Sequence, residues 1–419
     1  MMKSREIAVL FFTGTRVRYG AEEHMLTLLR ELPRTPFRFH MVCPPELAEK
    51  VRADLPADVE LIELPLTSSS RIKDILDFVK ILKTRHIDIL HSHMSFSSRF
   101  ASPIGWACGV RAILETNHVA ENWRRGWLKS SNLLDRAFGY FVDFFIAVSE
   151  ANALYLINRK RLPREKVVVI RNGCDLNRFS APSEKRFAMR KDMGLQEDTP
   201  TLIVPARLEL QKGHSVLLDA VPLILREFPR LQVICLGDGG LRRDLEAKVL
   251  QLNLQQTVRF LGFQPNLNNW FAMGDVTVLS SFYEGLPLVA IESLAASRAV
   301  VATAVDGTPE VVVDGISGKT VPPGQPVALA EAICGLLREP ALLEKLGRQG
   351  RDLVQREFNQ QRQVQQTAAL YFSCLGRPTQ RLDSKGETSS DAERGTNDER
   401  LATQSDKLLA KTAPIGFFI

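Results

Sequence analysis

The stretch from Asp275 to Ala295 reads DVTVLSSFYEGLPLVAIESLA and combines an apolar run, a short loop and a helical pattern. Residues 276–279 are apolar and rich in β-branched side chains, which predicts a buried strand. Residues 284–287, Glu-Gly-Leu-Pro, form the loop, and Pro287 suits the first position of a helix because its missing N–H costs nothing there. Apolar residues then recur at helical spacing, at Leu288, Ile291, Leu294 and Ala295.

Two glutamates occupy different places in this strand, loop and helix. Glu284 follows the carboxyl end of the strand, and Glu292 lies in the second turn of the helix. Backbone N–H groups of residues 285–289 face the same crevice, and a helix N-terminus beyond a strand end readily binds an anion. Open α/β sheets bind their ligands at such a place. We therefore expect ligand contacts from the loop residues Gly285, Leu286, Pro287 and Leu288.

Together with Arg207 and Lys212 upstream, this stretch resembles the retaining nucleotide-sugar glycosyltransferases of family GT4. The matching signature is Glu284 and Glu292 with seven residues between them, and Gly-Leu-Pro after the first. The resemblance extends from about residue 6 to about residue 375. It implies the α/β fold called GT-B, in which two Rossmann-like domains with parallel, doubly wound sheets face each other across a cleft. In that fold the donor binds mainly to the second domain and the acceptor to the first.

Arg207 and Lys212 lie in a predicted strand–helix loop and are candidates for binding a diphosphate. Arginine offers a forked pair of donors and lysine a point charge, so both can converge on one diphosphate. Groups that hold the charge of a departing diphosphate lower the barrier to its departure. No Asp-x-Asp metal motif is well placed, so we expect no metal cofactor. The alternative is that these are two surface cations near a helix start.

The resemblance implies separate roles for three further side chains. Glu292 would accept hydrogen bonds from the ribose hydroxyls, whereas Glu284 would hold a hydroxyl of the transferred sugar and steady oxocarbenium-like charge. His118 ends the predicted strand 112–118, where the relatives carry a histidine close to the donor sugar. Front-face attack, with the leaving phosphate taking the acceptor's proton, is the favoured account of retention. The alternatives are a surface Glu284 with a capping Glu292, and a crevice His118 without a catalytic part.

Three other positions are candidate donor contacts. Gly20 opens a helix after the predicted strand 7–12, where the relatives usually have two glycines and this chain has Tyr19 first. Gly237 begins a glycine-rich loop suited to close approach of a ribose or base, and Phe263 follows a strand that the relatives place against the base edge. For both glycines the alternative is an ordinary tight connection between strand and helix.

Two histidines end another predicted strand, residues 87–93. His91 and His93 are two residues apart and point to the same side of the strand. Such spacing resembles a metal site, but we find no third ligand near them in the sequence. We therefore interpret them as polar residues that face a crevice, and we expect no metal site.

The first part of the chain is basic. Residues 1–170 carry 25 Lys and Arg against 19 Asp and Glu, whereas residues 171–419 carry 29 against 29. This excess suggests peripheral contact with an anionic membrane, and the alternative is a contribution to solubility. Residues 122–129, NWRRGWLK, are the best candidate for leaflet contact or lipid-acceptor binding, with an acceptor lid and a plain loop as alternatives. No nucleic-acid-binding pattern is present.

Composition and pattern also predict the organisation of the chain. We expect an acceptor-side domain at residues 1–172, a nucleotide-sugar domain at 173–359, a helix at 360–376 that crosses back to the first domain, and a disordered tail at 377–419. Six scattered cysteines indicate a reducing compartment. We find no signal peptide and no membrane span, which favours a cytoplasmic protein, peripheral at the inner face of the cell membrane.

These observations lead to one expected function and two alternatives. We expect transfer of a hexose or N-acetylhexosamine from a UDP- or GDP-sugar to a lipid-linked or polysaccharide acceptor, without a metal. A UDP-sugar 2-epimerase-like enzyme on a similar fold is one alternative. The other is a non-catalytic scaffold that binds a nucleotide sugar.

Overall fold

A computed structural model describes residues 6–66, 72–119, 131–179 and 183–376 of the chain. These residues divide into two compact units. The first contains the described residues up to His118, those from 131 to Ile170, and those after Gln360, and the second contains Val119 and the described residues from Arg171 to Gln360. The sequence analysis placed the domain boundaries after residues 172 and 359, whereas these units meet after Ile170 and after Gln360. The predicted tail, residues 377–419, lies outside the described residues.

The first unit is built on a seven-stranded parallel sheet in the order β3-β2-β1-β4-β5-β6-β7. Its strands are β1 (Ile7–Phe12), β2 (Phe37–Cys43), β3 (Glu60–Glu63), β4 (Ile89–His93), β5 (Ala112–Asn117), β6 (Phe144–Ala147) and β7 (Val167–Val169). Every residue of β1, β4, β5 and β6 is buried, as expected for strands covered on both faces. The chain leaves β1 and β4 in opposite directions, which makes the edge between them a topological switch point.

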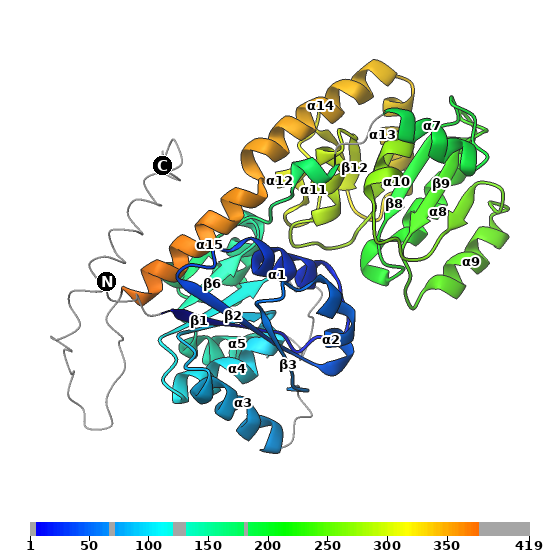
Figure 1. The fold of residues 1–419 in the computed structure, drawn as a ribbon. Helices are drawn as coiled ribbons and strands as arrows, with labels where there is room; N and C mark the ends of the chain where they lie inside the picture. Colours follow the sequence, from blue (N-terminus) through cyan, green and yellow to red (C-terminus); the bar gives the residue numbers. More distant parts are fainter. Residues whose placement is uncertain (1–5, 67–71, 120–130, 180–182, 377–419) are drawn as a thin grey trace. The chain divides into compact units, whose positions relative to one another are not determined.

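Helices cover both faces of this sheet (Figure 1). They are α1 (Gly20–Glu31), α2 (Pro45–Val51), α3 (Ile72–Thr84), α4 (Ser95–Ala107), α5 (Ser131–Phe138), α6 (Glu150–Leu154) and α15 (Gln360–Leu375). The described residues of the unit also form short helical segments at η1 (Arg52–Asp54), η3 (Gly139–Phe141), η4 (Tyr155–Arg159) and η5 (Arg164–Lys166). α1, α2 and α15 pack on the face that presents Val9 and Phe11, whereas α3 reaches the opposite face, where Phe78 contacts Phe12.

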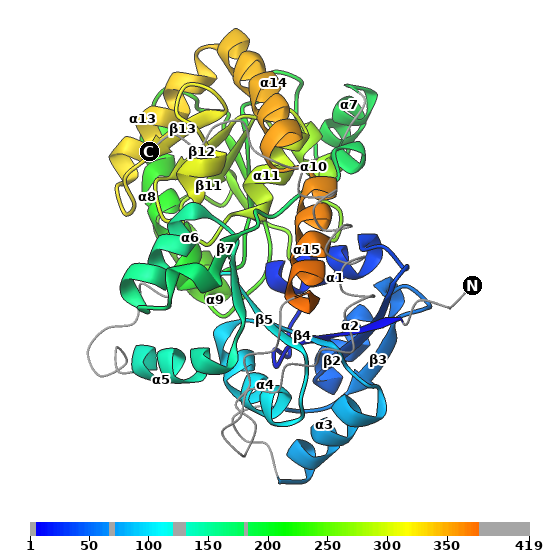
Figure 2. The same cartoon turned by 90° about the vertical axis from the view of Figure 1, so that its left-hand side faces the viewer.

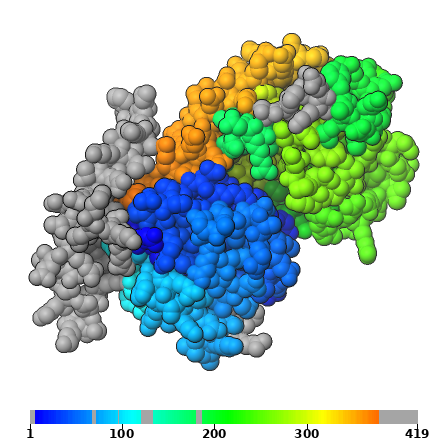
Figure 3. Space-filling view, in the orientation of Figure 1, coloured from blue at the N-terminus to red at the C-terminus, as the bar shows by residue number. Residues whose placement is uncertain are grey.

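The C-terminal helix α15 is part of the first unit although it follows the whole of the second in sequence. Val364, Ala368, Tyr371 and Phe372 bury their side chains in the same core as β1 and β2. The Tyr371 hydroxyl also lies 2.7 Å from His91 Nδ1 on β4. Figure 3 shows the orange atoms of this helix against the blue atoms of the first unit. The first sheet therefore needs residues beyond 360 to complete its core.

The second unit repeats the architecture with a six-stranded parallel sheet in the order β10-β9-β8-β11-β12-β13. Its strands are β8 (Thr201–Pro205), β9 (Gln232–Leu236), β10 (Val258–Phe260), β11 (Val276–Leu279), β12 (Val300–Thr303) and β13 (Gly318–Val321). The central position of β11, between β8 and β12, explains why its residues are all buried. The switch point of this sheet lies between β8 and β11.

Two groups of helices enclose the second sheet, as the turned view in Figure 2 also shows. They are η6 (Leu176–Phe179), α7 (Ser183–Asp192), η7 (Leu210–Lys212), α8 (His214–Leu225), α9 (Arg242–Gln251), α10 (Asn268–Met273), α11 (Leu288–Ala295), α12 (Thr308–Val311), α13 (Pro326–Leu337) and α14 (Pro340–Glu357). α8, α9 and α13 bury one apolar cluster with Val204, Val233 and Val278. α7, α10, α11 and α14 form the other layer.

These observations confirm the predicted fold class of two α/β units with parallel, doubly wound sheets. One expectation for residues 275–295 was wrong. Pro287 is not the first helical residue but the residue before it, because its backbone is extended, with φ −70° and ψ 101°. Within the described residues, none of the helices is both long and apolar enough to cross a membrane.

Candidate active site

The predicted cations and glutamates of the second unit follow two neighbouring strands. Arg207 and Lys212 come after β8, and Glu284 comes after β11, which pairs with β8 in parallel. The carboxyl ends of parallel strands meet at one edge of a sheet, so the two loops emerge side by side at the switch point. The structure therefore brings both loops to the position where open α/β sheets bind ligands.

Lys212 and Glu284 are in direct contact. Lys212 Nζ lies 2.6 Å from Glu284 Oε1, and the hydroxyl of Ser281 donates to the same carboxylate oxygen at 2.6 Å. The Glu284 carboxylate is largely buried, whereas the Lys212 side chain is 18% exposed. A hydrogen-bonded ion pair that is partly open to solvent can exchange one partner for an incoming charged ligand.

Arg207 is connected to the same group through Gln211. Its guanidinium donates to Gln211 Oε1 at 3.0 Å, and Gln211 Nε2 donates to the carbonyl of Tyr283 at 2.9 Å. The backbone N–H of Phe282 in turn donates to the Gln211 carbonyl at 2.7 Å. Gln211 was not among the predicted site residues, yet it joins the loop after β8 to the loop after β11.

Gly213 allows the backbones of these two loops to touch. It adopts a left-handed conformation with φ +62°, and a Cβ there would lie 2.1 Å from the Ser280 carbonyl oxygen. The Ser280 hydroxyl is within hydrogen-bonding distance of the carbonyl oxygens of Lys212 (3.1 Å) and Gly213 (3.0 Å). Only glycine permits both the conformation and this approach, so Gly213 helps to hold Lys212 against Glu284.

Asp306 is a site residue that the sequence analysis missed. Its carboxylate accepts a hydrogen bond from the backbone N–H of Glu284 at 2.8 Å. Asp306 itself adopts φ +43°, in the loop after β12, the other neighbour of β11. The available signal was the strand order, because a loop after β12 must emerge beside the loop after β11.

Glu292 lies in the second turn of α11, as predicted, and its side chain is half-buried. Burial, with a contribution from the Glu292 charge, raises the pKa of the Cys174 thiol. Gly285 and Leu286 lie between Glu284 and the first turn of α11, and Leu288 begins that helix. The first N–H groups of a helix have no partner within it, so this end of α11 remains the predicted anion-binding element.

Gly237 and Phe263 are the two remaining candidate donor contacts of the second unit. A Cβ on Gly237 would lie 2.2 Å from the Ala206 carbonyl oxygen, so this glycine is needed for the close approach of two loops. That observation favours the tight-connection alternative, and contact with a ribose stays a prediction. Phe263 is 74% exposed, which leaves its ring accessible to a ligand.

His214, like Gln211 and Asp306, is a residue that sequence reasoning missed. It begins α8, is 3% exposed, and neither ring nitrogen has a hydrogen-bond partner within the described chain. Burial, together with the nearby Lys212 charge, lowers the pKa of this histidine to about 4. The imidazole is therefore neutral at physiological pH and adds no positive charge beside Lys212.

The candidates of the first unit lie at the carboxyl edge of its sheet. Gly20 is the first residue of α1, after Tyr19, whose backbone N–H donates to Glu22 Oε2 at 2.8 Å. His118 directly follows β5 and is 9% exposed. Its Nε2 lies 3.2 Å from Nδ1 of His93, at the end of β4.

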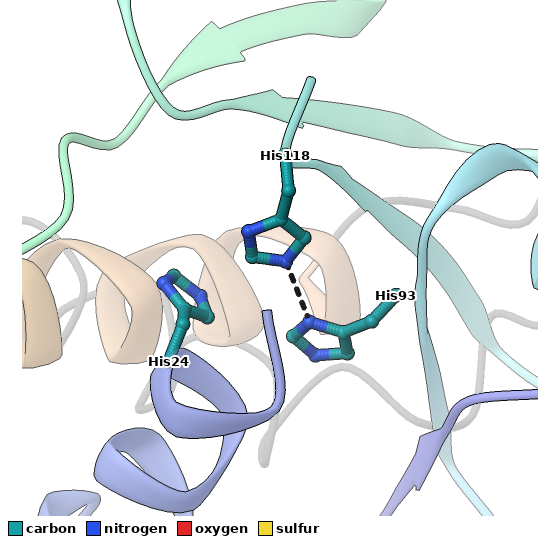
Figure 4. Close-up of side chains that lie close together, drawn as sticks. All are labelled: His24, His93 and His118. Carbon is teal, nitrogen blue, oxygen red and sulfur yellow. Dashed lines mark hydrogen bonds between the residues drawn. The ribbon is translucent and has the colours of Figure 1, made fainter. Parts of the chain in front are cut away.

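The view that no third ligand lies near the β4 histidines was wrong. His24 from α1 and His118 both approach His93, and one ligand nitrogen from each of these three residues lies within 4.8 Å of the others (Figure 4). The His91 ring packs against His93 with centroids 4.5 Å apart, but its nitrogens have other partners, the Tyr371 hydroxyl at Nδ1 and the Thr116 hydroxyl at Nε2, each at 2.7 Å. The three histidines come from separate parts of the chain, so local spacing did not reveal them.

Two family models match successive parts of the chain. The model described as "Glycosyltransferase Family 4" matches residues 19–178, and the one described as "Glycosyl transferases group 1" matches residues 185–353. The chain belongs to the family 4 glycosyltransferases. This membership favours a transferase over the epimerase-like and non-catalytic alternatives.

Curated proteins that are similar in sequence to this chain are also named as glycosyltransferases. A Bacillus subtilis protein named as the glycosyltransferase EpsD is 27% identical over 308 residues, which are 72% of this chain and 80% of that protein. The D-inositol 3-phosphate glycosyltransferase of Streptomyces avermitilis is 30% identical over 286 residues, 63% of this chain and 60% of that protein.

Solved structures share the fold. Anabaena Alr3699/HepE, in complex with UDP and glucose, superposes with a TM-score of 0.78 at 18% identity, covering 87% of this chain and 99% of that one. Sucrose-phosphate synthase from Thermosynechococcus elongatus gives 0.72 at 22% identity, covering 88% and 99%. Family 4 membership and these likenesses establish the GT-B type of fold. Residues 122–129, the candidate leaflet or acceptor contact, lie outside the described residues, so that prediction stays open.

Lowering the pH from about 7.5 to about 5 is expected to destabilise this glycosyltransferase through its buried histidines. Burial lowers the pKa of His91 to about 3, and it lowers the pKa values of His93 and His118 well below the ordinary value. Between the folded and unfolded pKa values the unfolded chain binds more protons, so the free energy of unfolding falls as the pH drops below about 6.5. The slope is up to about 1.4 kcal/mol per pH unit for each histidine.

Urea unfolding in the presence of a chelator, at several pH values in this range, measures the effect. His91→Gln should make the dependence shallower, because it removes one group that titrates only in the unfolded state. The same midpoint at both ends of the range would contradict this account of the histidines.

Proposed function

We propose that this glycosyltransferase moves a hexose or N-acetylhexosamine from a UDP- or GDP-sugar to a hydroxyl of a lipid-linked or polysaccharide acceptor, with retention of configuration. The observation that carries the proposal is the contact of Lys212 with Glu284 at the switch point of the second sheet. An ammonium and a carboxylate side by side suit a ligand that joins a diphosphate to a sugar. Solved relatives of the same fold hold UDP and UDP-glucose, which supports a nucleotide sugar as donor.

In this proposal the diphosphate binds to Lys212, Arg207 and the N-terminus of α11. These groups are preorganised before the donor arrives, because Gln211, Ser280 and Gly213 connect the loops that carry them. Preorganised donors aimed at developing charge stabilise a transition state most effectively. They would neutralise the leaving diphosphate without Mg²⁺ or Mn²⁺.

Glu284 has a second task once the donor is bound. When phosphate oxygens attract the Lys212 ammonium, the Glu284 carboxylate can accept a hydrogen bond from a hydroxyl of the transferred sugar. Its negative charge also favours an oxocarbenium-like centre. Glu292, farther along α11, would accept hydrogen bonds from the ribose hydroxyls, as an acidic residue does in dinucleotide-binding folds. In front-face attack, the acceptor's hydroxyl proton passes to the leaving phosphate oxygen.

A lipid-linked acceptor would bring this protein to a membrane surface. Exposed apolar side chains on α3 and α5 support peripheral contact: Ile72 is 78% exposed, Leu76 61%, Leu133 69% and Leu134 51%. Both helices contact α4, so they lie on the same face of the first sheet. Together with the basic charge of residues 1–170, this face suits an anionic leaflet. Co-sedimentation with anionic but not with neutral vesicles is the expected result.

A panel of nucleotide sugars tests the proposed reaction. One UDP- or GDP-sugar should raise the melting temperature most, and with a matching acceptor it should yield product with the anomeric configuration of the donor, without added Mg²⁺ or Mn²⁺. Wild-type transfer by Glu284→Ala would refute the site. An epimerised sugar nucleotide formed without acceptor would support the epimerase-like alternative, and binding without turnover over a broad acceptor panel would support the scaffold.

A further inference from the structure

Three buried histidines converge at the switch point of the first sheet. His24 lies on α1, which follows β1, whereas His93 ends β4 and His118 follows β5, the neighbour of β4. Figure 4 shows their rings directed toward a common space. They are 4%, 1% and 9% exposed. The arrangement is thus assembled by the topology of the sheet and shielded from bulk water.

The spacing of the ring nitrogens is close to that of ligands on one metal ion. Nδ1 of His93 and Nε2 of His118 are 3.2 Å apart. Two imidazole nitrogens on one tetrahedral zinc ion, each about 2.0–2.1 Å from it, are about 3.3–3.4 Å apart. One ligand nitrogen from each of the three rings lies within 4.8 Å of the others, so reaching the spacing of a zinc site requires a movement of at most about 1.4 Å.

The surroundings keep these imidazoles in the form that binds metals. Burial lowers the pKa values of His93 and His118 well below the ordinary value, so both are neutral with a lone pair available. The amide nitrogen of Gln363 on α15 lies 2.9 Å from His24 Nδ1. With this amide turned over, its oxygen would accept a hydrogen bond from Nδ1–H and leave His24 Nε2 to bind the ion. Phe11 stacks on His93 with ring centroids 5.6 Å apart and adds an apolar shell.

Hydrogen bonding within the protein does not fully account for the cluster. The contact between His93 and His118 uses one nitrogen of each ring. Nε2 of His93 is buried without a hydrogen-bond partner in the described part of the chain. Buried polar atoms usually have a partner, so hydrogen bonds within the described residues do not satisfy the His93 ring.

We propose that His24, His93 and His118 bind one divalent transition-metal ion of the zinc class. Imidazole nitrogen suits zinc, cobalt, nickel and copper rather than magnesium or calcium. Three neutral ligands leave the ion with its full charge and a fourth position for a water or a substrate oxygen. The site belongs to the first unit and is independent of the diphosphate-binding proposal, because it is not needed to neutralise the leaving group.

Equilibrium dialysis of the full, untagged chain against Zn²⁺ and Co²⁺, after treatment with a chelator, tests the site. The expected result is one ion per chain, with visible Co²⁺ absorption typical of tetrahedral coordination. His24→Ala, His93→Ala and His118→Ala should each weaken binding at least about 100-fold, and Gln363→Met about 10-fold. His86→Asn is the matched control, because it removes an exposed histidine of the same unit and should leave binding unchanged.

A second measurement uses only the wild-type chain, so its result does not depend on whether the variants fold. X-ray absorption of the zinc-loaded wild-type chain should show three imidazole ligands on the ion. Absence of saturable binding, fewer than two imidazoles, or binding that survives His93→Ala with retained circular dichroism would each overturn the proposal. The readout is bound metal rather than sugar transfer, so its failure would leave the proposed reaction untouched.

Discussion

Replacing Lys212 by methionine should lower kcat for sugar transfer about 100- to 1000-fold, the effect of removing one preorganised charge-stabilising group. Methionine approximates the length of lysine but has no charge, so the loop after β8 keeps most of its packing. UDP affinity should also fall, by about 10-fold or more, since a hydrogen bond to a charged group contributes about 1.5–3 kcal/mol. Steady-state kinetics and isothermal titration with UDP measure the two effects.

Glu284→Gln, unlike Lys212→Met, should leave UDP affinity unchanged or raise it. In the free protein the Glu284 carboxylate lies 2.6 Å from the Lys212 ammonium, where it competes with an incoming phosphate for that charge. Glutamine keeps the size of the side chain and removes the competing charge. UDP should therefore bind as tightly as to the wild type or more tightly, whereas transfer should still fall about 100-fold because the sugar loses its carboxylate partner.

Lys248→Met is the matched control for these experiments. Lys248 on α9 pairs with Asp219 at 2.7 Å and donates to the Ser215 hydroxyl at 2.7 Å, so the partners of its ammonium lie on α8 rather than in the loops that follow β8 and β11. Transfer and UDP binding should remain within about 2-fold of wild type, as expected for a surface ion pair. If Lys248→Met and Lys212→Met behaved alike, or if both site variants weakened UDP equally, Lys212 would not act on the diphosphate as proposed.

The second-unit site was largely predictable because its parts follow adjacent strands. An apolar run before Glu284 and another before Arg207 predicted two buried strands, and parallel pairing brings the ends of neighbouring strands together. The contact between Lys212 and Glu284 agrees with that expectation. Their chemical roles rest on the family resemblance, because no spacing in the sequence distinguishes a sugar hydroxyl from any other hydrogen-bond donor.

Contacts that depend on strand order were not predictable from local patterns. His24 and His118 are 94 residues apart and meet only because β1, β4 and β5 are neighbours in the first sheet. Asp306 supports Glu284 for the same reason, through the adjacency of β11 and β12. Helix α4 was not predicted from the sequence. Its residues, SFSSRFASPIGWA, include several serines and Pro103, and both residue types are less favourable than alanine within a helix.

Gly213→Ala should destabilise the second unit by about 2–4 kcal/mol and lower sugar transfer at the same time. An alanine in a left-handed conformation alone costs about 1–2 kcal/mol. The rest of the effect arises because the new Cβ would lie 2.1 Å from the Ser280 carbonyl oxygen, so one of the two loops must move. Any such movement separates Lys212 from Glu284.

Gly194→Ala separates the conformational cost from the steric one. Gly194 has φ +69°, close to the φ of Gly213, but a Cβ there would meet no atom within 4 Å. Urea unfolding should show a loss of only about 1–2 kcal/mol for this variant, with unchanged transfer kinetics. If Gly213→Ala were no more destabilising than Gly194→Ala, the two loops would be free to separate, and the close approach at Gly213 would not position Lys212.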